Sequence, residues 1–229
     1  MSSDAKPDLL HPVAAIKNVI APKVVEPEPR WPGFVALLAG ALLHAALPSR
    51  LSLGPDWLLP AFMVVLLVPI LVTHKQRRYA LARILTFVAA SALTLALVVS
   101  LALLIQGLPA HKDKPEELLR SASVLWVTNI LVFALWYWKL DAGGPIGRDN
   151  AVGPIKSSFL FPQMARQPAD TDWSPEFIDY LFVAFNTSTA FSPTDTAVLD
   201  RWAKVTTMLQ SIISLSVLVV LAARAINVL

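Results

Sequence analysis

Apolar residues occur along this chain in runs long enough to cross a lipid bilayer. Runs of about 18 or more apolar residues with few charges are typical of membrane-spanning helices. The pattern predicts five such helices, at about residues 31–47, 57–73, 80–106, 121–138 and 201–228. We therefore expect an all-α membrane protein with about five transmembrane helices.

A shorter apolar segment precedes the last predicted span. It covers residues 177–185 and is interrupted only by Asp179, so it is too short to cross a bilayer. Ser174 and Pro175 suit the N-cap and first position of a helix. Residues 186–196 are mostly polar, and irregular backbone at membrane depth is tolerated only inside protein or beside water. We therefore predict one short re-entrant helix and a filter-like loop before the last span.

These elements divide the chain into four parts. Residues 1–30 form a loosely ordered N-terminal arm, and residues 31–139 form a four-helix transmembrane region. Residues 140–173 form a Gly/Pro-rich linker without helix or strand periodicity. Its apolar segment FLFPQM, residues 159–164, is expected to dock on the helix bundle or at the membrane interface. Residues 174–229 contain the re-entrant helix, the loop and an inner helix.

Composition agrees with a membrane protein and offers no enzyme chemistry. The chain is 55% hydrophobic and 15% charged, with a mean hydropathy of +0.59, whereas about a quarter of residues are charged in soluble domains. The absence of cysteine excludes disulfides and thiolate metal sites. No serine–histidine–acid set, metal-ligand cluster or phosphate-binding loop is visible. We expect no catalytic residue, no metal and no cofactor.

Charge along the chain predicts an orientation. Lys and Arg number twelve in the N-terminal arm, in the loop at residues 75–83 and in the linker together with the adjoining Lys139, but four in the two loops that alternate with them. The positive-inside rule therefore places the N-terminus in the cytoplasm. We expect a multi-pass integral membrane protein of the bacterial inner (plasma) membrane. With five spans the re-entrant loop then enters from the cytoplasmic side, the opposite of pore-loop potassium channels. Either the loop is inverted or one of the five spans is wrong, and the first span, which is short and rich in small residues, is the weakest. Residues 136–138, Trp-Tyr-Trp, read as an interfacial aromatic belt. The net charge of +3 lies in loops and indicates topology, not a nucleic-acid partner.

Residues 187–195 read TSTAFSPTD and align without gaps with TxTTVGYGD, the filter signature of pore-loop cation channels. Thr187 and Thr189 match the threonines at the first and third places, and Asp195 matches the closing aspartate. This segment resembles a pore-loop filter. Residues 191–194, FSPT, stand in place of VGYG, and proline fixes φ where a potassium filter needs alternating backbone geometry. We therefore do not expect a potassium-selective filter.

The whole chain is similar in architecture to a second group, small uncharacterised bacterial membrane proteins with four helices and a C-terminal pore-loop-like segment. These resemblances imply an oligomeric ion channel or channel-like protein, with a tetramer favoured and monovalent cations as candidate permeant ions. The alternative is a non-conducting membrane scaffold or accessory subunit that keeps a pore-loop fold. The lipid bilayer is an expected partner in either case.

The candidate site residues fall into two groups. The filter-like loop comprises Thr187, Ser188, Thr189, Phe191, Ser192 and Asp195. The pore-lining stripe of the last helix comprises Thr207, Gln210, Ser211 and Ser214.

Each group also has a structural interpretation. Residues 192–195 match a capping box, in which Asp195 would start the last helix. The polar stripe could equally serve close packing between helices.

Overall fold

The structure is a computed structural model that describes residues 27–52, 54–76, 78–107, 114–151, 155–165, 173–189 and 195–226. The described chain is mainly helical, which confirms the all-α prediction. The elements, in chain order, are α2 (Trp31–Ala45), η1 (Ser49–Leu51), α3 (Leu58–Lys75), α4 (Tyr79–Gly107), α5 (Pro115–Leu140), η3 (Asp141–Gly143), α6 (Gly144–Asp149), β1 (Phe159–Leu160), η4 (Pro162–Ala165), α7 (Phe177–Thr189), β2 (Ala197–Val198) and α8 (Arg201–Ile226).

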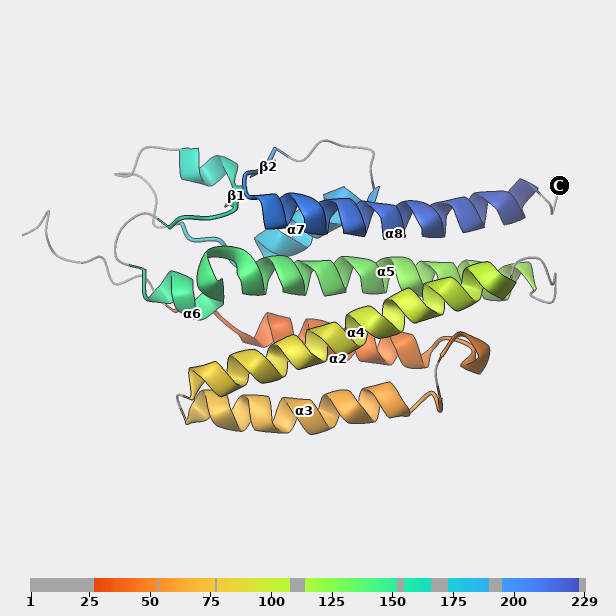
Figure 1. Cartoon of the computed structure of the whole chain (residues 1–229), viewed down its shortest axis with the longest axis horizontal. Coiled ribbons are helices and arrows are strands. Elements are labelled where there is room, and N and C mark those ends of the chain that lie inside the picture. Colours follow the sequence, from red (N-terminus) through yellow and green to blue (C-terminus); the bar gives the residue numbers. More distant parts are fainter. Residues whose placement is uncertain are drawn as a thin grey trace, which may run out of the picture.

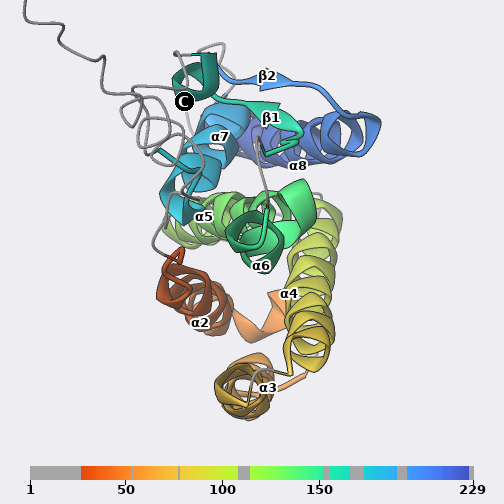
Figure 2. The same ribbon diagram turned by 90° about the vertical axis from the view of Figure 1, so that its left-hand side faces the viewer.

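Helix α5 lies at the centre of the bundle, between α2 and α4 on one side and α7 and α8 on the other (Figures 1 and 2). Helix α3 packs against α2 and α4 at the periphery. Of the most apolar stretch of α5, 67% is buried inside the protein, whereas the corresponding share for α8 is only 22%. The centre of the fold is therefore α5, and α8 keeps one face free.

Three helical segments among the described residues are long and apolar enough to cross a membrane: Tyr79–Gly107, Pro115–Asp149 and Arg201–Ala222. Two of the five predicted spans coincide with shorter apolar helices, Trp31–Ala45 and Leu58–Thr73. A helix of 15 residues such as α2 is about 22 Å long, less than the roughly 30 Å of a hydrocarbon core.

Large apolar side chains cover the outside of the bundle. An apolar exterior of this extent is typical of a surface in contact with lipid or with another protein. The exposed residues include Val64, Val65 and Val68 of α3, Leu81, Ile84 and Leu95 of α4, and Met208, Ile212, Leu215 and Val219 of α8.

Glycines allow α2 to approach its neighbours closely. A Cβ atom on Gly33 would overlap the six-membered ring of Trp138 in α5, and one on Gly40 would come within 2.6 Å of Leu93 in α4. Small residues at helix contacts favour such close packing in membrane proteins.

The linker contains more secondary structure than its composition predicts. It forms α6, and its strand β1 pairs antiparallel with β2, with Phe159 opposite Val198 and Leu160 opposite Ala197. The rings of Phe159 and Phe161 are buried, and both pack edge-on against Tyr180 of α7. These short elements depend on the bundle for their packing, which explains why local periodicity missed them. The FLFPQM segment does dock on the helix bundle.

The aromatic residues at the end of α5 do not form an interfacial belt. Tyr137 and Trp138 are fully buried, and Trp136 is half-buried and donates a hydrogen bond of 2.9 Å to the Thr94 hydroxyl of α4. The prediction was wrong because α5 is the central helix, so its last turns face protein on several sides.

Candidate functional site

Helices α7 and α8 enter the bundle from the same end and run in the same direction. Residue numbers increase on both helices from one contact to the next, as they do in parallel helices. Gln210 Nε2 donates to the Ala184 carbonyl at 2.6 Å, and Ser214 Oγ donates to the Ser188 carbonyl at 2.5 Å. Ser214 lies thirteen residues beyond the start of α8 at Arg201, a distance of about 20 Å along a helix. Helix α7 therefore ends part of the way along α8.

A set of buried side chains, with the half-buried Trp126, surrounds the end of α7, and we refer to it as the Gln210 cluster. It joins α5, α7 and α8. Its members are Trp126, Asn129, Tyr137, Ser188, Gln210 and Ser214.

Gln210 makes the most contacts within the Gln210 cluster. Its Nε2 donates to Ser188 Oγ at 2.7 Å as well as to α7 backbone, and its Oε1 accepts from the Tyr137 hydroxyl at 2.5 Å. Both ends of the amide are thus satisfied, as a fully buried amide requires.

The Gln210 cluster also supplies partners for the end of α7. The last carbonyls of a helix have no partner within the helix and must be satisfied from elsewhere. The Ser188 carbonyl accepts from Ser214 Oγ at 2.5 Å and from Trp126 Nε1 at 3.4 Å. A helix that ends inside the bundle thereby avoids an unpaired carbonyl at this position.

One polar atom of the Gln210 cluster lacks a hydrogen bond. Asn129 Nδ2 lies 3.3 Å from the Gln210 carbonyl and 3.4 Å from Ser188 Oγ, but its Oδ1 is buried without a partner. Burying an unpaired polar atom costs free energy, so this amide is a local weak point in the packing.

The predicted filter-like loop begins later than the sequence indicates. Thr187, Ser188 and Thr189 form the last turn of α7, and the threonine hydroxyls donate to the helix carbonyls of Val183 and Asn186. Phe191 and Ser192 lie outside the described residues. Asp195 is exposed.

The capping-box interpretation of residues 192–195 is wrong for the last helix. Strand β2 follows Asp195, and α8 begins only at Arg201. The backbone N–H of Lys204 donates to the carbonyl of Asp200, which therefore stands at the N-terminal boundary of α8. The side chain of Asp200 accepts a 2.6 Å hydrogen bond from Ser158 in the linker.

The predicted pore-lining stripe divides into two kinds of residue. Gln210 and Ser214 are buried and face α7 within the same chain. Thr207 and Ser211 are half-buried, and the Thr207 hydroxyl donates to the Lys204 carbonyl of its own helix. The contacts of the two buried residues are those expected of interhelical packing.

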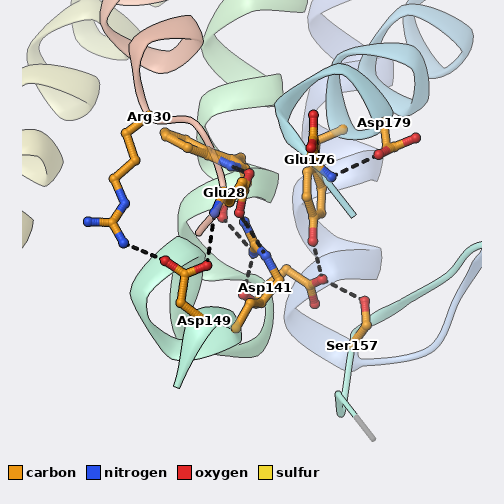
Figure 3. A network of polar contacts seen from close by, with 10 residues as sticks. Glu28, Arg30, Asp141, Asp149, Ser157, Glu176 and Asp179 are labelled. Atoms are coloured by element: carbon orange, nitrogen blue, oxygen red, sulfur yellow. Dashed lines mark hydrogen bonds and ion pairs between the residues drawn. The ribbon is translucent and has the colours of Figure 1, made fainter. Parts of the chain in front are cut away.

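A second polar network holds the linker against the end of the bundle at which α7 and α8 begin (Figure 3). Asp141 is fully buried at the end of α5. Its Oδ1 accepts from the Ser158 backbone N–H at 2.6 Å, and its Oδ2 accepts from the Tyr180 hydroxyl at 2.6 Å and the Ser157 hydroxyl at 2.5 Å. Asp141 thus joins α5, the linker and α7.

A buried ion pair fixes the segment before α2 to this network (Figure 3). Arg148 Nη2 contacts Glu28 Oε2 at 2.6 Å, and the same arginine donates to the carbonyls of Trp138 and Asp141. Glu28 also accepts a hydrogen bond from the Trp138 indole. Burial raises the pKa of Glu28, although Arg148 and Trp138 oppose this rise. Residues 1–26 of the predicted N-terminal arm lie outside the described residues, but Glu28 is firmly held.

Sequence reasoning did not find Glu28, Asp141 or Arg148. No local signal marked them, since each lies within two residues of another charged residue in the sequence. The start of α7 also differs from the expectation of a Ser174 cap. Asp179 Oδ2 accepts from the Glu176 backbone N–H at 2.8 Å, the reciprocal contact of a capping box, so the helix begins two residues later than Pro175.

Comparisons with protein-family models, curated proteins and solved structures found no match to this chain. Within the described residues, no group of three His, Asp or Glu side chains is arranged to hold a metal ion. The candidate site is therefore defined by its own geometry: a short helix that ends inside the bundle on a buried polar cluster.

Proposed function

We propose that this chain is a multi-pass membrane protein whose α7 is a re-entrant helix and whose copies assemble into a channel-like oligomer. One observation carries the proposal: α7 and α8 enter from the same end, and α7 stops about 20 Å along α8. A span would continue to the other end, whereas a re-entrant helix returns. On this proposal α2, α3, α4, α5 and α8 are the five membrane helices.

The end of α7 has the electrostatics that suit a cation. Backbone dipoles add up to a partial negative charge at the C-terminal end of a helix. Thr187 and Thr189 lie in this last turn, and Asp195 adds an exposed carboxylate in the segment that returns to α8. A cation near the end of α7 would therefore be attracted by helix carbonyls and, at the mouth, by Asp195.

The conduction path would lie between copies of the chain. The Gln210 cluster fills the contact of α5, α7 and α8 within one chain, so the exposed faces of α7 and α8 must meet other molecules. Those faces are apolar, with Ile178, Phe182 and Phe185 on α7 and Met208 and Ile212 on α8. Several copies around one axis would cover them and bring the α7 ends together. A tetramer remains the favoured number.

A specific observation favours the second candidate, a non-conducting scaffold or accessory subunit. Ser188, Gln210 and Ser214 satisfy one another inside a single chain, so they have little capacity left for an ion. In a scaffold this cluster would only hold the re-entrant helix in place, and the docked linker would offer a surface for a partner.

Ion flux into liposomes distinguishes the two candidates. We expect vesicles with the purified full-length chain to take up a monovalent cation faster than protein-free vesicles. Asp195→Asn and Thr189→Ala should each reduce this uptake. Glu176→Gln removes one exposed negative charge at the same end of the bundle and should leave it unchanged. Uptake equal to that of protein-free vesicles would reject the channel and support the scaffold.

A further inference from the structure

A small cleft opens between α2, α4 and the junction of α5 and α6. Three cationic side chains line it, Arg30 before α2, Arg83 of α4 and Lys139 of α5, together with apolar residues such as Phe34 and Ile70. Its volume is about 30 Å³, which is space for roughly two water molecules. It therefore admits one small polar group and not a hydrocarbon chain.

Positive charge at this cleft exceeds negative charge. Of the cations at or beside it, Arg30 pairs with Asp149 at 2.5 Å and Arg148 pairs with Glu28 at 2.6 Å. Two cations, Arg83 and Lys139, remain without a carboxylate partner among the residues that the structure describes.

Aromatic rings lie next to both of these cations. Arg83 Cζ lies 5.5 Å from the centre of the Phe87 ring, and Lys139 Nζ lies 4.5 Å from that of the Trp138 ring. Such contacts lower the cost of burying a cation but do not neutralise it.

Burial, and then the charges around it, make the position of the Lys139 ammonium group costly without an anion. Three cations act on its ammonium group, Arg30, Arg148 and Arg83, against one carboxylate, Glu28. Like charges gathered in a partly buried cleft repel one another, and a bound anion would relieve this repulsion.

We propose that this cleft binds the phosphate group of an anionic phospholipid. The apolar exterior next to it supplies the second half of such a site, because Leu71 of α3 and Leu81 and Ile84 of α4 are exposed and would lie against acyl chains. Basic pockets between membrane helices on the positively charged side commonly hold anionic head groups. This inference requires only that the chain lies in a membrane and does not depend on conduction.

A lipid suits the cleft better than a free phosphate ion. The space accepts phosphate oxygens but is too small for an entire solvated ion, and its walls include apolar side chains that would exclude water. A head group anchored by acyl chains on the exposed faces of α3 and α4 would present its phosphate at the cleft without entering it completely.

Native mass spectrometry of the full-length chain, purified in detergent and mixed with phosphatidylglycerol or phosphatidylcholine, tests the proposal. We expect the unaltered protein to retain phosphatidylglycerol in preference. Arg83→Gln with Lys139→Gln should reduce this retention about 30-fold, the effect of two cations at an anionic lipid surface. Lys156→Gln with Lys204→Gln removes the same net charge from exposed positions outside the cleft and should preserve the preference.

A charge-conserving double substitution tests whether misfolding explains a loss of lipid retention. Arg83→Lys with Lys139→Arg keeps both charges and should retain most of the lipid preference, while circular dichroism checks that the glutamine variant is folded. Equal retention of the two lipids by the unaltered protein would overturn the proposal. So would equal retention of phosphatidylglycerol by the two glutamine pairs. Stabilisation of the unaltered protein by inorganic phosphate, without any preference between the lipids, would also overturn it and assign the cleft to the free anion.

Discussion

Ser214 of α8 donates a hydrogen bond of 2.5 Å to the backbone carbonyl of Ser188 at the end of α7. This contact satisfies a carbonyl that the helix itself leaves without a partner. It also sets the depth at which α7 ends relative to α8. The same serine would belong to the pore lining if the last helix faced an aqueous path.

Ser214→Ala tests which role this serine has. We expect the substitution to lower the free energy of unfolding by about 1 kcal/mol, because one interhelical hydrogen bond is lost and a carbonyl is left poorly satisfied. Ser216→Ala is the matched control, since that hydroxyl bonds to Ile212 of its own helix, and it should change stability by less than about 0.5 kcal/mol. Thermal unfolding in detergent measures both. Equal shifts for the two variants would contradict the structural role of Ser214.

Gln210→Ala should be more damaging than the loss of Ser214. The amide contacts Tyr137, Ser188 and the α7 backbone, so its removal leaves several buried polar groups without partners. We expect a loss of about 2–4 kcal/mol, together with faster hydrogen exchange in the last turn of α7. Gln106→Ala, at an exposed position of α4, is the control and should be nearly neutral. Unchanged exchange in α7 would show that Gln210 does not hold this helix.

Stability should depend on pH through Glu28. Its folded-state pKa is raised above the usual 4.5 by burial, so the folded state favours the protonated carboxyl more than the unfolded state does. The stabilisation from this group is complete below pH 4.5 and is lost as pH rises through the raised pKa. Thermal midpoints across this range should therefore fall less steeply with rising pH in Glu28→Gln than in the unaltered protein.

The control for Glu28 is Glu116→Gln, an exposed position in the first turn of α5. This substitution should leave the difference in thermal midpoint between low and neutral pH close to that of the unaltered protein. The same pH profile for Glu28→Gln and the unaltered protein would contradict the prediction and mean that the ion pair with Arg148 cancels the effect of burial on the pKa of Glu28. Thermal midpoints that rise with pH in the unaltered protein relative to Glu28→Gln would mean that the ion pair outweighs burial.

Gly33→Ala should loosen the contact of α2 with α5. The added Cβ would overlap the Trp138 ring, so that ring or the helix must shift, at a cost of about 1–3 kcal/mol. Gly107→Ala is the matched control, because a Cβ there meets nothing within 4 Å, and it should change stability by less than about 0.5 kcal/mol. Chemical unfolding in detergent compares the two variants. A neutral Gly33→Ala would indicate that α2 and α5 pack less closely than in the structure.

The helices themselves were largely predictable. The ranges expected for the spans, such as 80–106 and 201–228, agree with α4 and α8 to within a few residues where the structure describes them. Apolar runs report helix position because hydrocarbon accepts a backbone only when its hydrogen bonds are satisfied locally. The short helix before the last span was also anticipated, although its end at Thr189 was not.

The site was less predictable, because its contacts join residues far apart in the chain. Gln210 and Ser214 were recognised as a polar stripe, but no local pattern shows that they face Ser188 of α7 and not an open pore. The roles of Asp141 and Arg148 also depend on partners distant in sequence, Tyr180 and Glu28. A charged residue in a polar linker looks the same in the sequence whether it is solvated or buried in the fold.

The sequence by itself determined the helical class, the approximate bounds of the helices, and the short apolar segment that interrupts the series of long ones, since these follow from local hydrophobicity and length. Tertiary structure alone decided that α5 is central and that α7 ends beside Ser214. It also decided that the linker closes one end of the bundle through Asp141. The physical reason is that burial and hydrogen-bond pairing arise only when distant segments pack together, and the order of residues along the chain does not specify which segments those are.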